Sequence, residues 1–267
     1  MDATSRATRE TDTVLPSYYL EQRARVLETG NAAEDCDTGV CWAEVVETAA
    51  TVAIDGRLAV WRGDVTRLAT AGIVNAANEG LLGGGGIDEA VHAAAGPLLQ
   101  YECALATKAM GGLPDAGETV VSHGYALPAR YVLHTVAPYL DDTGEVQDDV
   151  LAAAYRSILA AAADYELTSV AIPCIGTGFY GFPLSRATRI AAAVVGEWLE
   201  ADVARVRAAA ADPTTSSSDM QWAFPHRIVL VGWTASQTKL LARAVSDLFS
   251  QRPPAAPTTK LASRDTL

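Results

Sequence analysis

The sequence has few aromatic residues, few cysteines and few positive charges, and it lacks a long apolar run. Aromatic residues make up 7% of its 267 positions, and four residues are cysteine. No stretch of about 18 apolar residues is present, so we expect no transmembrane helix. The first residues, MDATSRATRETD, have no apolar centre and include acids, so we expect neither a secretory signal nor a transit peptide. We therefore expect a reduced intracellular location, the cytoplasm or else the nucleus.

The shortage of positive charge argues against polyanionic partners. Lys and Arg together number 20 against 32 Asp and Glu, giving a net charge of −12. Such a chain is not expected to hold nucleic acid or an anionic membrane through bulk charge. A small anionic ligand held by backbone groups is compatible with this charge.

The cysteines do not form a recognisable metal-binding pattern. Cys36 and Cys41 lie in the acidic segment AEDCDTGVCW, and their spacing is not a common zinc pattern. No second cysteine pair and no histidine cluster accompanies them. Cys103 and Cys174 lie in helical or apolar contexts and are expected to be buried thiols. The sequence therefore predicts no metal site.

Apolar residues make up 49% of the chain, enough for a sizeable core, and their patterning predicts one domain between two extensions. Residues 1–51 form a partly helical extension, disordered over 1–14 with helical spacing in 17–27 and 41–50. Residues 52–250 form the domain, and the Pro-rich residues 251–267 form a disordered tail. We expect a hairpin over 51–65, further strands within 71–78, 118–125, 131–138, 169–176 and 227–234, and helices within 87–107, 148–166, 177–206 and 236–249.

Strands that alternate with helices indicate an α/β fold. Such a pattern is typical of a three-layer α/β/α sandwich with a mixed, mostly parallel sheet. No internal repeat and no second domain is apparent.

Two glycine-rich loops follow predicted strands. The first, LLGGGGID, follows IVNAAN, and the second, GTGFYGFP, follows SVAIPCI. In α/β sheets, ligands bind beyond the carboxyl ends of the strands. Glycines expose backbone N–H groups, and a helix N-terminus adds partial positive charge. One such cluster alone is explained by a tight turn; two in matching positions predict a diphosphate clamp that uses no Lys or Arg.

Common nucleotide motifs do not fit these loops. A P-loop requires GxxxxGK[ST], and no Lys follows either cluster. A dinucleotide fingerprint requires GxGxxG opening the first helix, whereas here Asp88 follows the glycines. Neither a nucleoside triphosphatase nor a Rossmann dehydrogenase is indicated.

Four separated motifs carry a family resemblance. WRGDVT, IVNAANEGLLGGGGIDEAVHAAAG, LPARYVLHTVAP and IPCIGTGFYGFP occur in order over about residues 52 to 250. Together they resemble the macrodomain family of ADP-ribose-binding modules. The GGGGID-x-x-x-H form is similar to the MacroD-type branch, whose members hydrolyse ADP-ribose esters. The Cys and His ligands of the zinc-containing branch are missing here, which again implies no metal, and no cofactor is implied.

The resemblance implies a binding role for fourteen positions, Asp88 among them. Asp64 would accept the adenine amine, with Val65 offering backbone, since a carboxylate only accepts hydrogen bonds; the alternative is a helix cap. Asn78 would bond the distal ribose, Tyr180 would pack against that ribose, and Trp233 would pack against adenine. For Trp233, as for Phe179, a core position is the alternative. The phosphate loops would comprise Gly84, Gly85, Gly86 and Ile87, and Gly176, Thr177, Gly178, Phe179 and Tyr180.

The resemblance makes Asp88 the catalytic candidate, acting with Asn78. The branch is proposed to use this carboxylate, helped by the ligand's own diphosphate, to position or activate a water near the scissile ester. The alternative is that Asp88 caps the helix that follows. His92 lies one turn later on the same face, as a tuning residue or a packed one.

The remaining polar residues near these motifs are expected to have structural roles. Asn75 is expected to hold loop backbone, and His123 and His134 to be structural. Two positions depart from the pattern of relatives. Glu89 stands where relatives usually have a small residue and adds negative charge beside Asp88, and Gly176 replaces a serine and so removes a hydroxyl donor. We expect both departures to affect turnover more than binding.

The sequence thus predicts a protein that binds ADP-ribose and hydrolyses ester-linked ADP-ribose. Substrates would be proteins mono-ADP-ribosylated on Asp or Glu, and O-acetyl-ADP-ribose. Its partners would be ADP-ribose and ADP-ribosylated proteins. Three alternatives stay open: a non-catalytic reader of ADP-ribosylated proteins, an ADP-ribose 1″-phosphatase, and an interaction protein acting through its N-terminal helices.

Overall fold

The computed structural model describes residues 39–54, 56–138, 146–211, 214, 221 and 223–250. The predictions for residues 1–38 and for the tail 251–267 therefore lie outside the described residues. Cys36 and most of the polar loop after residue 211 are likewise outside them. The sheet and helices described below lie between Trp42 and Ser250.

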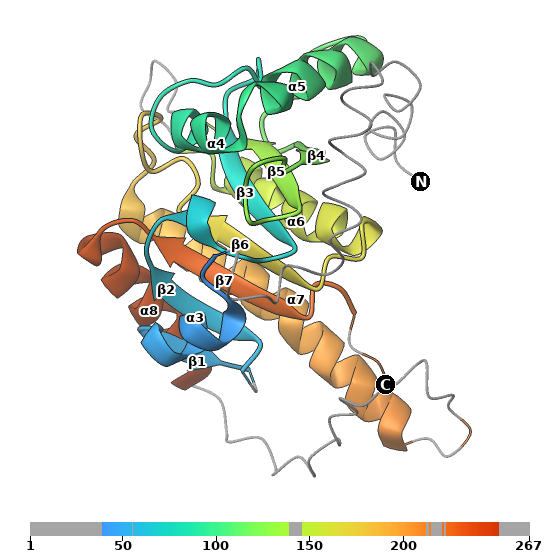
Figure 1. The fold of residues 1–267 in the computed structure, drawn as a ribbon. Coiled ribbons are helices and arrows are strands. Elements are labelled where there is room, and N and C mark those ends of the chain that lie inside the picture. Colours follow the sequence, from blue (N-terminus) through green and yellow to red (C-terminus); the bar gives the residue numbers. More distant parts are fainter. Residues whose placement is uncertain are drawn as a thin grey trace.

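Seven strands form one mixed sheet, with helices on both faces (Figure 1). Its order is β1-β2-β7-β6-β3-β5-β4, and the neighbours from β2 to β5 are parallel. The edge strands β1 and β4 pair antiparallel with β2 and β5. The bounds are β1 Thr51–Ala53, β2 Leu58–Arg62, β3 Gly72–Ala77, β4 Thr119–His123, β5 Tyr131–Val136, β6 Ser169–Pro173 and β7 Arg227–Gly232. This confirms the predicted fold class.

Strand alternation divides the core into two halves. Leu58 and Val60 point to one face of the sheet, whereas Ala59 and Trp61 point to the other. The first face is covered by α6 Asp148–Asp164, α7 Leu184–Ala211 and α8 Ala235–Ser250. The second is covered by α3 Trp42–Thr48, the 3-10 turn η3 Val65–Arg67, α4 Ile87–Ala95 and α5 Pro97–Met110. Near-continuous apolar strands are expected where both faces are buried.

One predicted helix is in fact two. The segment 87–107, expected as a single helix, forms α4 and α5, which meet at Gly96. Gly96 has a φ of +84°, which favours glycine, and Pro97 has no N–H to continue the first helix. The Gly-Pro pair therefore ends α4 and begins α5, with proline at a position where helices accept it.

Part of the N-terminal extension packs on the domain. α3 buries Val45 in the second half of the core, and Val40 forms a parallel bridge with Leu68. Cys41 is disulfide-bonded, which the sequence analysis did not predict. None of the described helices has the length and apolar character needed to cross a membrane.

The sheet places a crevice between β3 and β6. These strands are parallel neighbours, yet the chain leaves β3 toward α4 on one face and leaves β6 toward α7 on the other. Loops that diverge to opposite faces open a crevice at the carboxyl edge, where ligands bind in α/β proteins.

Candidate ligand-binding and active site

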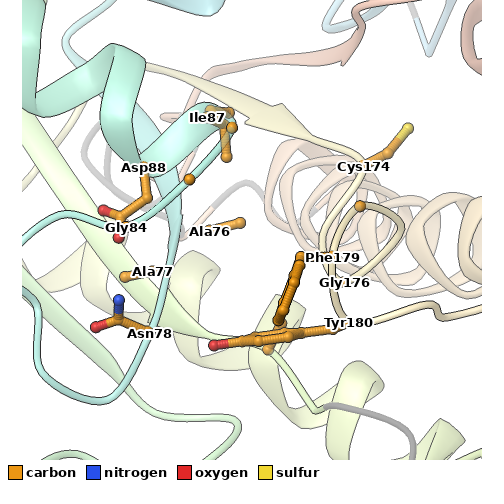
Figure 2. A pocket seen from close by; sticks show the side chains of 14 residues that line it. Ala76, Ala77, Asn78, Gly84, Ile87, Asp88, Cys174, Gly176, Phe179 and Tyr180 are labelled. Atoms are coloured by element: carbon orange, nitrogen blue, oxygen red, sulfur yellow. The ribbon is translucent and has the colours of Figure 1, made fainter.

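The two glycine-rich loops face each other across this crevice. Figure 2 shows Asn78, Gly84 and Asp88 on one side and Gly176, Phe179 and Tyr180 on the other. The cavity between them has a volume of about 660 Å³. It is lined by Ala76, Ala77, Asn78, Gly84, Gly85, Gly86, Ile87, Asp88, Ala137, Cys174, Gly176, Gly178, Phe179 and Tyr180. We call it the central cavity.

A second hollow, of about 400 Å³, adjoins the central cavity. The two share Gly86, Ile87, Cys174 and Gly178, so they form one elongated depression. We call this hollow the inner hollow. Its lining consists of Gly63, Asp64, Val65, Thr66, Gly86, Ile87, Ala90, Pro173, Cys174, Thr177, Gly178, Val231, Trp233 and Gln237. All fourteen predicted site residues thus line one hollow or both.

Backbone, rather than cationic side chains, forms the middle of this depression. Among the described residues that line the central cavity and the inner hollow, none is Lys or Arg. Gly86, which precedes α4, has φ +67° and ψ −125°, a conformation that is essentially restricted to glycine. No side chain caps α4, so its first-turn N–H groups are available to an anion.

Asp88 is buried at the wall of the central cavity, with 3% of its surface exposed. Asn75 Nδ2 donates a hydrogen bond of 2.7 Å to its Oδ1. Its other oxygen, Oδ2, accepts no hydrogen bond from any described residue. The helix-cap alternative is wrong, because Gly86 is the N-cap of α4 and no side chain caps the helix. One oxygen of the carboxylate is instead held by Asn75, and the other is buried without a partner among the described residues.

Asn75 is the residue whose role the sequence analysis missed. It is fully buried on β3, and β5 places His134 directly beside it in register. Asn75 Nδ2 also lies 3.1 Å from His134 Nδ1. A carboxylate only accepts, so the amide nitrogen faces Asp88, and His134 Nδ1 then serves as the second acceptor. His134 Nε2 correspondingly carries the proton and donates to Ser122 Oγ at 2.8 Å.

A signal for Asn75 was present in the strand pattern. Ile73 and Ala77 point into the apolar half of the core beneath α4 and α5, and Asn75 lies between them on that face. Val132 and Val136 flank His134 in the same way. A polar residue within a buried apolar stripe needs a polar partner. Which partner it takes depends on how the two strands and α4 come together.

His92 contacts Asp88 from the next turn of α4. Its Nε2 lies 3.5 Å from Asp88 Oδ1, and its side chain is nearly buried. Burial lowers the pKa of His92, and the nearby charge of Asp88 offsets this only in part. His92 is therefore uncharged at neutral pH and borders Asp88 as a neutral imidazole.

Gly84 lies between the two predicted catalytic side chains. A Cβ at this position would stand 2.9 Å from Asn78 Nδ2 and 3.1 Å from Asp88 Oδ2. The amide and the free carboxylate oxygen therefore flank the same small volume. Asn78 Nδ2 has only a long contact, 3.5 Å, with the carbonyl of Gly83. A donor and an acceptor thus face a space that only a residue without a side chain leaves open.

Asp64 combines the two functions considered for it. Its Oδ1 accepts hydrogen bonds from Thr66 N at 3.0 Å and Thr66 Oγ1 at 2.7 Å, which caps η3. Its Oδ2 accepts no hydrogen bond from a described residue, and the side chain lines the inner hollow. The cap thus orients the carboxylate and leaves one oxygen for a ligand.

Two aromatic residues are surface residues rather than core ones. Trp233 is 66% exposed at the rim of the inner hollow, and Phe179 is fully exposed at the rim of the central cavity. The core alternative is therefore wrong for both. Gln237 Oε1 accepts hydrogen bonds from the backbone N–H groups of Trp233 and Thr234, which fixes the loop that carries the indole.

Cys174 borders both hollows as a neutral thiol. Burial raises its pKa to about 12, so the reactive thiolate is scarce at neutral pH. Cys103, also expected to be a buried thiol, is buried and free, and burial raises its pKa as well. Nucleophilic catalysis by these two cysteines is therefore disfavoured.

One group of potential metal ligands occurs among the described residues, behind Asp88. The ligand atoms of His92, Cys103 and His134 lie within 4.8 Å of one another. Both ring nitrogens of His134 already have protein partners, Asn75 and Ser122, and Cys103 stays protonated. His134 and Cys103 thus belong to a hydrogen-bonded cluster behind Asp88, whereas the ring nitrogens of His92 make no hydrogen bond to a described residue. The prediction of a metal-free site stays a prediction.

The two departures from relatives differ in consequence. Glu89 is exposed and is not among the residues lining the central cavity or the inner hollow. Gly176 has a φ of +74°, so a serine here would be strained. Replacing Gly176 by serine would test backbone strain as much as a hydroxyl group.

Comparison with known proteins places these features in context. A model of the Macro domain family matches residues 74–191. A Macro domain-containing protein of Methanosarcina mazei is 45% identical over 144 residues, covering 54% of this chain and 74% of that protein. ADP-ribose glycohydrolase MACROD2 of Homo sapiens is 45% identical over 145 residues, or 54% of this chain and 33% of that enzyme. The matched segment thus spans about a third of the human protein.

Solved structures agree with these sequence matches. The Trypanosoma brucei macrodomain in complex with ADP-ribose has a TM-score of 0.62 and 33% identity, over 78% of this chain and 77% of that one. The Oceanobacillus iheyensis macrodomain with ADP has a TM-score of 0.61 and 30% identity, over 73% and 93%.

Proposed function

Because the chain belongs to the macrodomain family, we propose that it binds ADP-ribose and hydrolyses ADP-ribose that is ester-linked to another molecule. The adenine would occupy the inner hollow, against Trp233 and the free oxygen of Asp64. The diphosphate would lie between the glycine loops, and the distal ribose would lie between Asn78 and Tyr180. Macrodomains solved in complex with ADP-ribose and with ADP support a ligand of this kind for the chain.

One observation carries the hydrolase part of the proposal. Asp88 is held through Oδ1 by buried Asn75, and its Oδ2 shares with Asn78 Nδ2 the space over Gly84. A carboxylate with one fixed and one free oxygen can orient a water molecule as a general base. The amide can bond the ribose whose ester is attacked. Fixing both groups before substrate arrives lowers the entropic cost of the reaction.

The proposed reaction consumes one water. The water is oriented by Asp88 Oδ2 and attacks the acyl carbon of the ester, and the bond between this carbon and the distal ribose oxygen breaks. The proton that the water gives up passes to Asp88 or to the diphosphate and from there to the departing ribose oxygen. ADP-ribose and a free carboxylic acid leave. Substrates are proteins mono-ADP-ribosylated on Asp or Glu, and O-acetyl-ADP-ribose.

The test is release of ADP-ribose from a peptide mono-ADP-ribosylated on glutamate, with ADP-ribose binding measured by calorimetry in parallel. The wild-type chain is expected to release ADP-ribose. The Asp88→Ala variant is expected to bind ADP-ribose and release none. Glu197→Gln on α7, an exposed position outside the lining of both hollows, serves as the control.

Binding without release by the wild type would replace hydrolysis with the non-catalytic reader. Asp64, Trp233 and the glycine loops support binding independently of Asp88, so the two parts of the proposal can fail separately. Failure to bind ADP-ribose would overturn both.

A further inference from the structure

A third hollow adjoins the central cavity at its far end. It has a volume of about 620 Å³ and is lined by Asn78, Glu79, Gly80, Leu113, Phe179, Tyr180 and Gly181. It shares Asn78, Phe179 and Tyr180 with the central cavity and no residue with the inner hollow. We call it the outer hollow. The three hollows therefore form a row in which the central cavity lies in the middle.

The order of the hollows corresponds to the order of groups in an ADP-ribosylated protein. In that molecule adenine is at one end, the distal ribose follows the diphosphate, and the modified polypeptide is attached to the distal ribose. With adenine in the inner hollow and the ribose at Asn78, the polypeptide must leave beside Asn78 and Tyr180. Those two residues border the outer hollow.

The outer hollow exposes apolar side chains. Phe179 is fully exposed and Leu113 is 59% exposed, and they come from two loops far apart in sequence. Large apolar side chains that gather at the rim of a pocket mark surfaces for binding. The loop between α5 and β4 supplies Leu113, and the loop after β6 supplies Phe179.

The charge at the outer hollow is negative. Glu79 is exposed, and among the described residues of the lining it is the one that carries a charge. It forms no ion pair with another described residue. The whole chain also carries a net charge of −12. A polypeptide with Lys or Arg near the modified residue complements this surface, whereas an acidic one is repelled.

We propose that the outer hollow binds the polypeptide bearing the ADP-ribose, and that it favours a segment with an apolar side chain and a Lys or Arg beside the modified residue. The inference rests on the proposed function, because it uses the proposed orientation of ADP-ribose. It adds to that function a preference among protein substrates that the nucleotide part alone does not supply.

The experiment compares three substrates. Two peptides carry the same ADP-ribosylated glutamate and the same neighbouring leucine, one with flanking lysines and the other with flanking glutamates. O-acetyl-ADP-ribose, which has no polypeptide, is the third. The kcat/KM values are measured for wild type, Glu79→Gln, Glu79→Lys, and the control Glu197→Gln, whose exposed glutamate lies on α7, outside the lining of the outer hollow.

The wild type is expected to prefer the lysine-flanked peptide. Glu79→Gln should reduce this preference by about threefold at low salt, as for one exposed charge pair. Glu79→Lys should shift it toward the glutamate-flanked peptide, and 0.5 M salt should diminish the differences. All variants should act on O-acetyl-ADP-ribose as the wild type does. Leu113→Ser should lower kcat/KM for both peptides and leave that small substrate unaffected.

An unchanged peptide preference in both Glu79 variants would overturn the inference, as would equal effects on peptides and O-acetyl-ADP-ribose. If the wild type hydrolyses nothing, calorimetry of the two ADP-ribosylated peptides against free ADP-ribose gives the same comparison as affinities. Hydrolysis without peptide preference refutes the outer hollow alone, whereas failure to bind ADP-ribose refutes the proposed function.

Discussion

Replacing Asn75 by alanine removes the donor that holds the catalytic candidate in place. Asn75 Nδ2 lies 2.7 Å from Asp88 Oδ1, and both side chains are buried. Without the amide, the Asp88 carboxylate can turn and its Oδ2 no longer points consistently toward the space over Gly84. We therefore expect Asn75→Ala to lower kcat while the nucleotide part of the site keeps its shape.

The size of the effect follows from the bond that is lost. A hydrogen bond to a charged group contributes about 1.5–3 kcal/mol. At about 1.4 kcal/mol per tenfold change in rate, loss of the whole contribution at the barrier lowers kcat by about 10- to 150-fold. Affinity for ADP-ribose should change by less than about threefold, because Asn75 is not among the residues lining the hollows.

The assay separates positioning from folding. Single-turnover release of ADP-ribose gives the rate of the chemical step, calorimetry gives affinity, and urea unfolding gives stability. Asn75→Asp keeps the shape but places a second carboxylate against Asp88, so its rate should fall at least as far. Ser122→Ala, which removes a partner of His134 rather than of Asp88, should have a smaller effect.

Two results would refute this reasoning. A folded Asn75→Ala variant with kcat within twofold of wild type would show that the carboxylate does not depend on this bond. An equal loss of affinity and rate would show that Asn75 only shapes the cavity.

Three further predictions concern other parts of the site. Asp64→Asn keeps an oxygen for the helix cap but loses the charged acceptor, so it should weaken ADP-ribose binding about tenfold and ribose 5-phosphate binding little; equal effects by calorimetry would refute the adenine assignment. Gly84→Ala places a methyl group 2.9 and 3.1 Å from the flanking amide and carboxylate, so turnover should fall at least tenfold while the melting temperature changes little; normal turnover would mean that no reacting atom uses that space. Burial lowers the pKa of His134 from 6.5 to about 3. As pH falls below 6.5, the histidine therefore takes up a proton in the unfolded chain but not in the folded one, which favours unfolding. Urea titrations should find the free energy of unfolding reduced by about 2 kcal/mol at pH 5 relative to pH 7.5. His134→Gln should lack that contribution, and an unchanged pH dependence in the variant would contradict it.

Most of the fold was predictable because it depends on local patterns. Strands with buried residues on both faces and helices of regular period were visible in the sequence, and they determine the layers. The break at Gly96 was missed although glycine followed by Pro97 is a boundary signal. Continuous helical spacing on both sides outweighed it.

The site was predictable where it depends on loop sequence, and not where it depends on packing. The glycine loops and Asp88 stand out along the chain, and they line the same cavity. Asn75 does not stand out along the chain, because its partners Asp88 and His134 lie 13 and 59 positions away and meet it only in the folded protein. Exposure of Trp233 and Phe179 was equally undecidable, since an aromatic residue at a strand end or in a loop suits core and rim alike.

The most direct test of the central claim is a single-turnover measurement with Asp88→Ala and a peptide mono-ADP-ribosylated on glutamate, at protein concentrations that saturate binding. We expect the variant to bind the peptide as the wild type does and to release ADP-ribose at least a hundredfold more slowly. Release at the wild-type rate would contradict it, because the buried carboxylate held by Asn75 would then have no part in the reaction.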